Sequence, residues 1–376
     1  MFDVILVAPD SFKGSATAPE VAAALARGLR RALPERTQVR EVPVSDGGDS
    51  LLDVLRPAGF EPVTSRTVGP TGAPLDSTYA VRGDTAVVEL AAASGLSRLP
   101  GGRPDPLGAS SYGTGLQVAQ ALDGGARTVV LGLGGSACTD GGAGLLEALG
   151  ARLLEADGRP VARGGAALAE VTSVSLDEAR RRCGNTEIVL ACDVDNPLLG
   201  KHGAATVFGP QKGASADQIG ELDAALARWA RAVERAYPDA AGRSETPGAG
   251  AAGGTAYGAL VGCGATISRG TDVVLDLLDI DALLPETELV ITGEGRLDDQ
   301  TLRGKAPAGV TARATAAGVP VVLVAGRVDL TAQEVRRLGA GRAYALTDLC
   351  ADPERSMREA TGLLERVGEQ IAADLH

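Results

Sequence analysis

Signals for buried parallel strands recur at both ends of this chain, and they constrain its fold more than any other feature. Short apolar runs at residues 4–9 and 289–292, and strand-like segments at 39–44 and 319–325, each end within two residues of a glycine or an aspartate. Segments with helical periodicity lie between them. Strands that alternate with helices form a parallel sheet with helices on both faces. The two ends of the chain therefore predict one doubly wound α/β domain.

The middle of the chain has a different pattern. Residues 61–90 contain short strand-like segments joined by tight turns, which is typical of antiparallel pairing. Residues 239–254, rich in Ala, Gly, Pro and Ser, are expected to form a mobile connection. We predict that residues 1–65 and 285–376 form the doubly wound domain, and that residues 66–284 form a mixed α/β domain inserted into it. A cleft between these domains is the expected active site.

Composition excludes several classes of protein. Of the 376 residues 44% are apolar, and the formal net charge of −12 argues against nucleic acid and anionic membranes as partners. No apolar run is long enough to cross a membrane, and five scattered Cys without a C-x-x-C pattern indicate neither a disulfide framework nor a zinc site. We therefore expect a cytoplasmic protein. With only two His in the chain, a carboxylate is the expected general base.

The most informative motif is a glycine-rich loop that follows a predicted strand at residues 128–133. Five glycines lie between positions 134 and 144, and the chain then continues into a helix. Backbone N–H groups in such a loop form a nest for a phosphate or a carboxylate, and the helix start adds positive potential. We predict that phosphates bind here, with Mg²⁺ near Asp140. The loop residues expected to contact phosphate are Gly134, Gly135, Ser136, Thr139, Gly141 and Gly142.

The same loop supports a second interpretation. The segment from Gly132 to Ala137 fits the G-x-G-x-x-A pattern of dinucleotide-binding folds, and Glu155 and Asp157 lie near where a ribose-binding acid is expected. An NAD(P)-dependent hydroxy-acid dehydrogenase is therefore an alternative. Against it, Asp140 would face a pyrophosphate unshielded, whereas a metal between carboxylate and phosphate is typical of phosphoryl transfer. The chain has no G-x-x-x-x-G-K-[ST] P-loop.

Charged residues also gather at the predicted ends of strands near the N-terminus. The first strand is followed by Asp10, Ser11 and Lys13, and the second strand is followed by Asp46. These positions lie at the ligand edge of an open parallel sheet, where they can hold an anion or a metal–anion pair. Only four of the 36 basic residues are Lys, so a Lys retained at such an edge indicates a need for a compact ammonium group. Lys305, just before a predicted helix near the C-terminus, is a further candidate for phosphate contact.

Three later motifs add candidates of the same kind. Asp193 and Asn196 follow another apolar strand, an arrangement that suits Mg²⁺ binding or removal of a hydroxyl proton. Lys212 lies between glycines and is a candidate for neutralising a phosphate or a substrate carboxylate. Glu294 and Arg296 end a strand, and the glycines on both sides of Glu294 indicate close approach to a metal or a nucleotide. Glu294 is therefore a second candidate ligand for Mg²⁺.

Taken together, these motifs resemble the bacterial glycerate kinase family usually called type I. Asp49-Ser50 stands where the second motif more commonly reads Glu-Gly, and Cys138-Thr139 stands where the loop more often has Thr-Asn. Neither departure removes a needed charge. The matching stretches occur in family order over nearly the whole chain: APDSFKGS (8–15), SDGGDS (45–50), ELAAASGL (89–96), SSYGTG (110–115), LGGSACTDGGAG (133–144), CDVDNPLLG (192–200), FGPQKGA (208–214), PGAGAAGG (247–254) and TGEGRLDDQTLRGKAP (292–307).

The resemblance implies transfer of the γ-phosphoryl group of ATP to D-glycerate with Mg²⁺. It also implies a flavodoxin-like domain with a second domain inserted, and a preference for the 2-phosphate product. On this basis we expect Asp193 to accept the hydroxyl proton, with Asp46 as second candidate. Lys13 and Lys212 are expected to offset charge on the phosphoryl group and on the glycerate carboxylate.

One alternative from another class remains besides the dehydrogenase. A non-catalytic sensor of hydroxy acids would bind glycerate without ATP, but it leaves the carboxylate clusters unexplained. The expected partners are small molecules, glycerate and ATP, and association into a homo-oligomer is left open.

Overall fold

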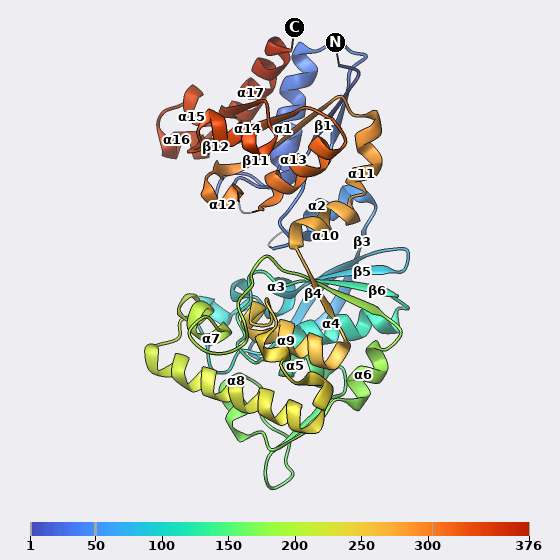
Figure 1. Cartoon of the computed structure of the whole chain (residues 1–376), viewed down its shortest axis with the longest axis vertical. Coiled ribbons are helices and arrows are strands. Elements are labelled where there is room, and N and C mark those ends of the chain that lie inside the picture. Colours follow the sequence, from blue (N-terminus) through green and yellow to red (C-terminus); the bar gives the residue numbers. More distant parts are fainter. Residues whose placement is uncertain (1, 49–50, 303, 376) are drawn as a thin grey trace. The chain divides into compact units, whose positions relative to one another are not determined.

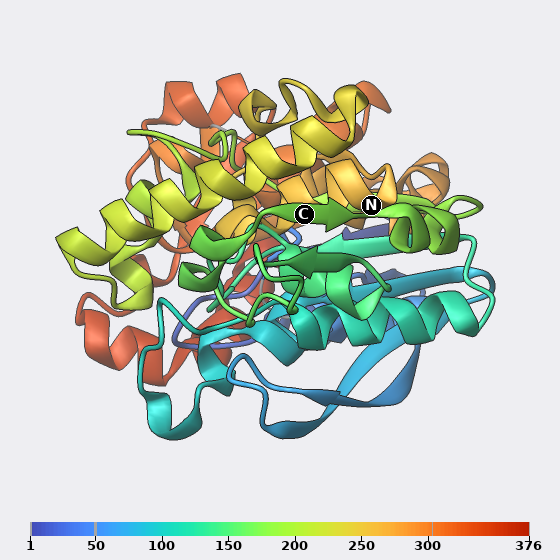
Figure 2. The ribbon, with the colours of Figure 1, turned by 90° about the horizontal axis from the view of Figure 1, so that it is seen from below.

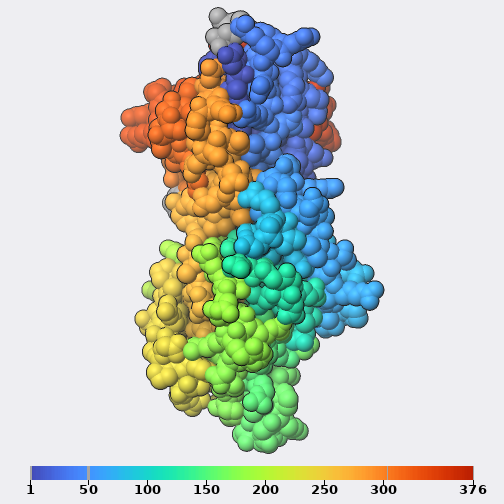
Figure 3. Space-filling view, turned by 90° about the vertical axis from the view of Figure 1, so that its right-hand side faces the viewer, coloured from blue at the N-terminus to red at the C-terminus, as the bar shows by residue number. Residues whose placement is uncertain are grey.

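The computed structural model describes residues 2–48, 51–302 and 304–375, so the Asp49-Ser50 variant lies outside the described residues. The chain divides into two compact units, which Figure 1 shows as ribbons. The first unit comprises Met1–Asp46, Asp53–Gly59 and Thr271–His376, and the second comprises Gly47–Leu52 and Phe60–Gly270. In the space-filling view of Figure 3, blue and orange surfaces from opposite ends of the sequence adjoin within the first unit.

The first unit is built on a five-stranded sheet in the order β13-β12-β11-β1-β2, and every pairing in it is parallel. Taken in chain order, the strands are arranged 2-1-3-4-5, which is the flavodoxin-like order. The direction of winding reverses between β1 and β11, so the topological switch point lies there. The strands are β1 (Val4–Val7), β2 (Gln38–Glu41), β11 (Leu289–Leu297), β12 (Val321–Val328) and β13 (Arg342–Ala345).

Two long helices from opposite ends of the chain pack together on this sheet. Helix α1 begins with a capping box in which Thr17 and Glu20 satisfy each other's backbone N–H groups, as the Thr-x-x-Glu pattern predicts. A Cβ at Gly28 would lie 1.9 Å from the carbonyl oxygen of Glu365 in α17, so only glycine permits this close crossing. The helices of the unit are α1 (Ala18–Ala32), α10 (Gly270–Leu277), α11 (Ile280–Leu283), α12 (Asp299–Leu302), α13 (Ala306–Ala316), α14 (Ala332–Leu338), α15 (Leu346–Leu349), α16 (Pro353–Arg358) and α17 (Ala360–Asp374).

The second unit contains a mixed six-stranded sheet in the order β10-β9-β6-β5-β4-β3. Its β3-β4-β5 part is antiparallel, as residues 61–90 predicted, and β5, β6, β9 and β10 pair in parallel. Together the two sheets confirm the predicted α/β class with one doubly wound and one mixed sheet. The strands are β3 (Glu61–Val68), β4 (Pro74–Arg82), β5 (Thr85–Glu89), β6 (Thr128–Gly132), β9 (Glu187–Ala191) and β10 (Thr266–Ser268), with a separate hairpin of β7 (Arg152–Leu154) and β8 (Ser173–Ser175).

The helices of the second unit enclose a core that includes the buried side chains of Trp229 and Tyr257. Figure 2 shows α8 as a long yellow-green helix. The helices are α3 (Leu90–Ser94), α4 (Tyr112–Asp123), α5 (Ala143–Ala148), α6 (Asp177–Cys183), α7 (Ala204–Phe208), α8 (Ala216–Ala236) and α9 (Ala251–Cys263), while α2 (Leu51–Leu55) spans the boundary of the two units.

The structure moves the boundaries expected from the sequence. Strand β3 belongs to the second sheet, and α10 and α11 belong to the first unit, so the chain passes from one unit to the other near residues 46, 52, 60 and 270. The segment 239–254, which was expected to connect parts of the molecule, lies inside the second unit; its residues 248–254 are buried, and α9 already begins at Ala251. In the described ranges, no helix is both long and apolar enough to cross a membrane.

Candidate active site

A cavity of about 740 Å³ lies at the carboxyl edge of the five-stranded sheet, wholly within the first unit. Loops after all five strands line it, because the carboxyl ends of parallel strands meet at one edge. The structure thus brings together the site residues predicted from both ends of the sequence. These residues are Asp10, Ser11, Lys13, Asp46, Glu294 and Arg296, and Lys305 joins them.

Asp10 is the most perturbed carboxyl group in this cavity. It is 8% exposed, and one of its oxygens accepts a hydrogen bond from the Ser11 N–H at 2.6 Å. Burial, and then the negative charges of Asp46 and Glu294, raise the pKa of Asp10 to about 7, although the Ser11 N–H and the ammonium of Lys13 oppose the shift. A buried carboxyl group with a perturbed pKa in a cavity is typical of a functional site.

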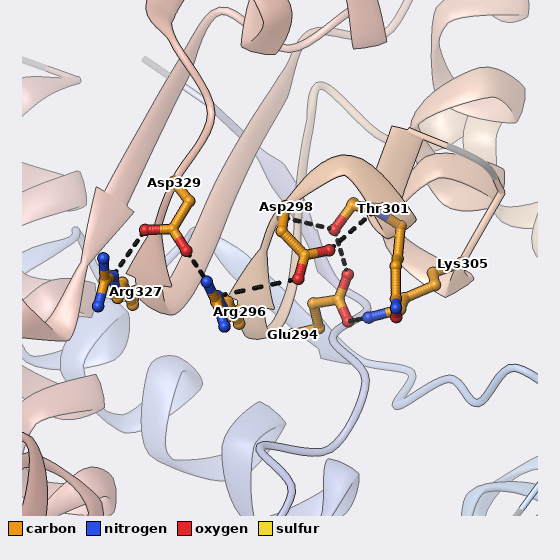
Figure 4. Close-up of polar contacts among 8 residues, drawn as sticks. Glu294, Arg296, Asp298, Thr301, Lys305, Arg327 and Asp329 are labelled. Carbon is orange, nitrogen blue, oxygen red and sulfur yellow. Dashed lines mark hydrogen bonds and ion pairs between the residues drawn. The ribbon is translucent and has the colours of Figure 1, made fainter.

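Glu294 lies on β11 and is held by two partners from the segment that follows it. The Thr301 hydroxyl donates to Oε1 at 2.6 Å, and the Lys305 ammonium donates to Oε2 at 2.9 Å (Figure 4). Glu294 is 6% exposed, so its carboxylate is largely shielded from water. Because both of its oxygens are engaged, Glu294 is suited to fix the position of Lys305 more than to bind a metal directly.

Arg296 belongs to a chain of ion pairs along the rim of the cavity. Its Nε lies 2.5 Å from Asp329 and 3.8 Å from Asp298, and Arg327 donates to the other oxygen of Asp329 at 2.6 Å (Figure 4). Hydrogen bonds from the two guanidinium groups, that of Arg296 above all, lower the pKa of Asp329. Arg327 and Asp329 were not predicted as site residues, although their position directly after a predicted strand was a usable signal.

The glycine-rich loop of the second unit does not form an open cradle for a phosphate. The carboxylate of Asp140 fills it, accepting hydrogen bonds from the N–H groups of Gly142 and Gly144 at 3.2 and 3.3 Å. Ser111 adds its N–H and its hydroxyl at 2.7 and 2.9 Å, and the Ser110 hydroxyl donates at 3.1 Å. Asp140 is 1% exposed. The anion that this nest binds is therefore a side chain of the protein itself, and Asp140 is not placed to hold Mg²⁺.

Most other residues predicted in this loop are also buried against protein. A Cβ at Gly141 would lie 2.6 Å from the Trp229 ring, and one at Gly142 would lie 2.8 Å from the Cα of Gly258, so these glycines serve packing. Thr139 is fully buried. Lys212, which lies outside this loop in the sequence, is likewise only 2% exposed, and its Nζ donates to the backbone oxygen of Cys138 at 2.5 Å. Those four residues therefore do not reach a solvent-filled site in this structure.

The geometry also argues against the dinucleotide interpretation. In dinucleotide-binding folds the helix begins at the second glycine of the G-x-G-x-x-A motif, which would be Gly134 here. In this structure β6 ends at Gly132, and α5 begins only at Ala143. The strand that ends before Glu155 belongs to the separate β7–β8 hairpin and not to the parallel sheet. Neither half of the expected cofactor site is therefore formed.

A second group of predicted residues lies at the carboxyl edge of the parallel strands β6 and β9. Gly134 is partly exposed and Gly135 is exposed, whereas Ser136 is buried beside them. Asp193 is exposed, and its Oδ1 accepts a hydrogen bond from the Gly270 N–H at 3.0 Å. Asn196 instead donates to the carbonyl oxygen of His202 at 2.9 Å, which stabilises the local turn.

Comparison with known proteins gives one consistent result. The sequence profile described as the glycerate kinase family matches residues 5–376. The chain belongs to the glycerate kinase family. Glycerate kinase of Bacillus subtilis (strain 168) is 40% identical over 374 residues, covering 99% of this chain and 97% of the relative. Glycerate 2-kinase of Escherichia coli (strain K12) is 38% identical over 376 residues, with coverage of 99% and 97%.

A solved structure supports the same assignment. The crystal structure of the Salmonella typhimurium LT2 protein assigned as glycerate kinase 2 superposes with a TM-score of 0.87 at 39% sequence identity, covering 99% of this chain and 98% of that one. The resemblance inferred from the motifs is thereby confirmed, and so is the predicted fold class. Family membership makes the chain a phosphotransferase of the glycerate kinase type, and a kinase of this family implies ATP as the phosphoryl donor.

Proposed function

We propose that this protein transfers the γ-phosphoryl group of ATP to the C2 hydroxyl of D-glycerate, and so forms 2-phosphoglycerate. The choice of hydroxyl is supported by the Escherichia coli relative, which is named as a glycerate 2-kinase. The observation that carries the proposal is the cavity of the first unit, which is lined by five acidic side chains and two ammonium groups. The argument uses Asp10, Asp46 and Glu294, with Lys13 and Lys305; Asp329 and Asp348 are the other two acidic residues.

We propose Mg²⁺ as the metal, held by Asp10 and Asp46. Mg²⁺ in kinases is usually held by one or two carboxylates, with phosphate oxygens and waters completing its coordination. The raised pKa of Asp10 is evidence for the fit, since it arises from burial beside two negative charges that a divalent cation would offset. When bound, the metal neutralises charge that develops on the phosphate oxygens.

The remaining roles follow from where the side chains lie. Lys13 is exposed in the cavity, and Lys305 is fixed there by Glu294, so both are suited to oppose charge on phosphoryl oxygens. We assign the proton of the glycerate hydroxyl to Asp193, whose carboxylate is oriented by the Gly270 N–H. The ammonium of Lys212 is buried, so we assign it a structural role: it supports the glycine-rich loop through its hydrogen bond to the Cys138 carbonyl oxygen.

Phosphorus NMR of the reaction product tests the proposal. The protein is incubated with Mg·ATP and D-glycerate, and the new phosphorus signal is recorded without proton decoupling. Phosphate on C2 couples to one carbon-bound hydrogen and gives a doublet, whereas phosphate on C3 couples to two and gives a triplet. A doublet is the expected result. A triplet would assign the reaction to the C3 hydroxyl and overturn the proposed product.

A further inference from the structure

The cavity of the first unit has two chemically different ends. Its polar end follows β2, β1 and β11, and includes Asp46, Asp10 and Glu294. This end lies at the switch point of the sheet, where ligands of doubly wound folds bind. The charged groups there suit the phosphates of a nucleotide, with a metal ion.

The other end follows β13 and is richer in apolar side chains. Phe12 from the first loop lines it together with Leu346, Ala351, Pro353, Met357 and Ala360 of the C-terminal segment, and Thr347, Asp348 and Ser356 of the same segment add polar groups. Met357 is 48% exposed, although it is a large apolar side chain. Its Cε lies 3.3 Å from the place that a Cβ on Gly14 would occupy, so the side chain reaches the loop that carries Lys13.

An exposed methionine at the edge of an apolar cavity is suited to contact a flat ring. The thioether is polarisable and makes favourable contacts with aromatic systems. Phe12 and Leu346 are almost fully buried, so they form a fixed wall, whereas Met357 supplies the accessible side. Together these side chains offer an apolar surface against which a planar ring can pack.

The dimensions of the cavity distinguish between the two proposed substrates, ATP and glycerate. Adjacent strands lie about 4.8 Å apart, so the three intervals from β1 to β13 correspond to roughly 14 Å. The volume of about 740 Å³ falls within the range of about 300–1,000 Å³ for sites that take drug-sized ligands. A three-carbon acid would occupy one end only. A nucleoside triphosphate has a polar end and an apolar end separated by a ribose.

We propose that this cavity is the nucleotide site, with the adenine ring against Met357, Phe12 and Leu346 and the phosphates at the polar end, beside Asp10, Asp46 and Lys305. The inference rests on the proposed function for the choice of ATP. It departs from the sequence prediction, which assigned the phosphates to the glycine-rich loop now found to be filled by Asp140.

Isothermal titration calorimetry on Met357→Ser tests the proposal, with Val207→Ser as the matched control. Val207 is likewise an exposed apolar side chain, at 42%, but it belongs to the second unit and does not line the cavity. Each protein is titrated with Mg·ADP, with inorganic tripolyphosphate and with D-glycerate. We expect Met357→Ser to weaken ADP binding by about tenfold, while tripolyphosphate and glycerate bind as they do to wild type. Val207→Ser should match wild type throughout.

Three results would overturn the assignment. Unchanged ADP affinity in Met357→Ser would remove the base from this end of the cavity. Weakened glycerate binding with normal ADP binding would make the cavity the acid site. Absence of ADP binding by the wild-type chain would remove the nucleotide site altogether. Because the readout is binding, a chain that binds ADP as expected but fails to phosphorylate glycerate would refute only the proposed function.

Discussion

The Lys305 ammonium lies 2.9 Å from Oε2 of Glu294, across ten intervening residues, and this ion pair joins β11 to the start of α13. Glu294 is 9% exposed at its side chain and Lys305 30%, so water screens the pair only partly. The pair determines where one of the two lysine side chains that line the cavity lies. Its partners therefore affect both the stability of the unit and its binding of phosphate.

Lys305→Met should destabilise the first unit, because among the described residues it leaves the buried Glu294 carboxylate with the Thr301 hydroxyl as its one remaining side-chain partner. We expect the free energy of unfolding in urea to fall by about 1–3 kcal/mol. Lys201→Met, which alters an exposed lysine in the second unit, is the control and should change stability by less than about 0.5 kcal/mol. Equal stability of the two variants would show that the Glu294 pair is not a structural contact.

Asp140→Asn tests the conclusion that Asp140 is structural. The asparagine amide would turn a donor toward a site that already contains five donors, from Ser110, Ser111, Gly142 and Gly144. We expect a loss of about 2–4 kcal/mol in the free energy of unfolding, measured by denaturant titration. The exposed Asp157→Asn is the control. If Asp140→Asn unfolds like wild type but loses Mg²⁺-dependent turnover, Asp140 is a metal ligand after all.

Lys212 gives a prediction about pH. Burial lowers the pKa of its ammonium below the ordinary value of 10.5. The unfolded state therefore binds more protons between the two pKa values, and the contribution of Lys212 to stability rises with pH in that window. We expect Lys212→Met to lose about 2 kcal/mol near pH 7, because the Cys138 carbonyl loses its donor, and the deficit should grow toward pH 10.5. A deficit that stays constant or shrinks with pH would contradict this.

Asp193→Asn tests the assigned base. We expect kcat to fall by about two orders of magnitude or more, since general base catalysis contributes that much, while the affinity for Mg·ADP stays within twofold to threefold. Asp195→Asn, two residues along the same exposed segment, is the control and should keep most of its activity. Near-normal turnover of Asp193→Asn would remove Asp193 from this role, and Asp46 would become the next candidate.

Local sequence patterns were sufficient to predict the strands of the parallel sheet and residues at their ends. Strand ends marked by Asp10 and Glu294 predicted residues that meet at one sheet edge, because parallel strands bring their carboxyl ends together. The glycine-rich loop shows the limit of the approach. Its pattern predicted a nest for a phosphate or a carboxylate. Which anion occupies the nest depended on Ser111, which binds the Asp140 carboxylate and lies 29 residues away in the sequence. The apolar wall with Met357 was not predicted, because its residues come from the loop after β1 and from separate segments near the C-terminus and show no common motif.

Release of ADP from Mg·ATP in the presence of D-glycerate is the most direct test of the account, with L-glycerate, tartronate and glycerol measured alongside. We predict rapid ADP formation with D-glycerate, and rates at least tenfold lower with the other three compounds and with no acceptor. No D-glycerate-dependent ADP release at saturating Mg²⁺ would contradict the proposed function, whatever the binding measurements show.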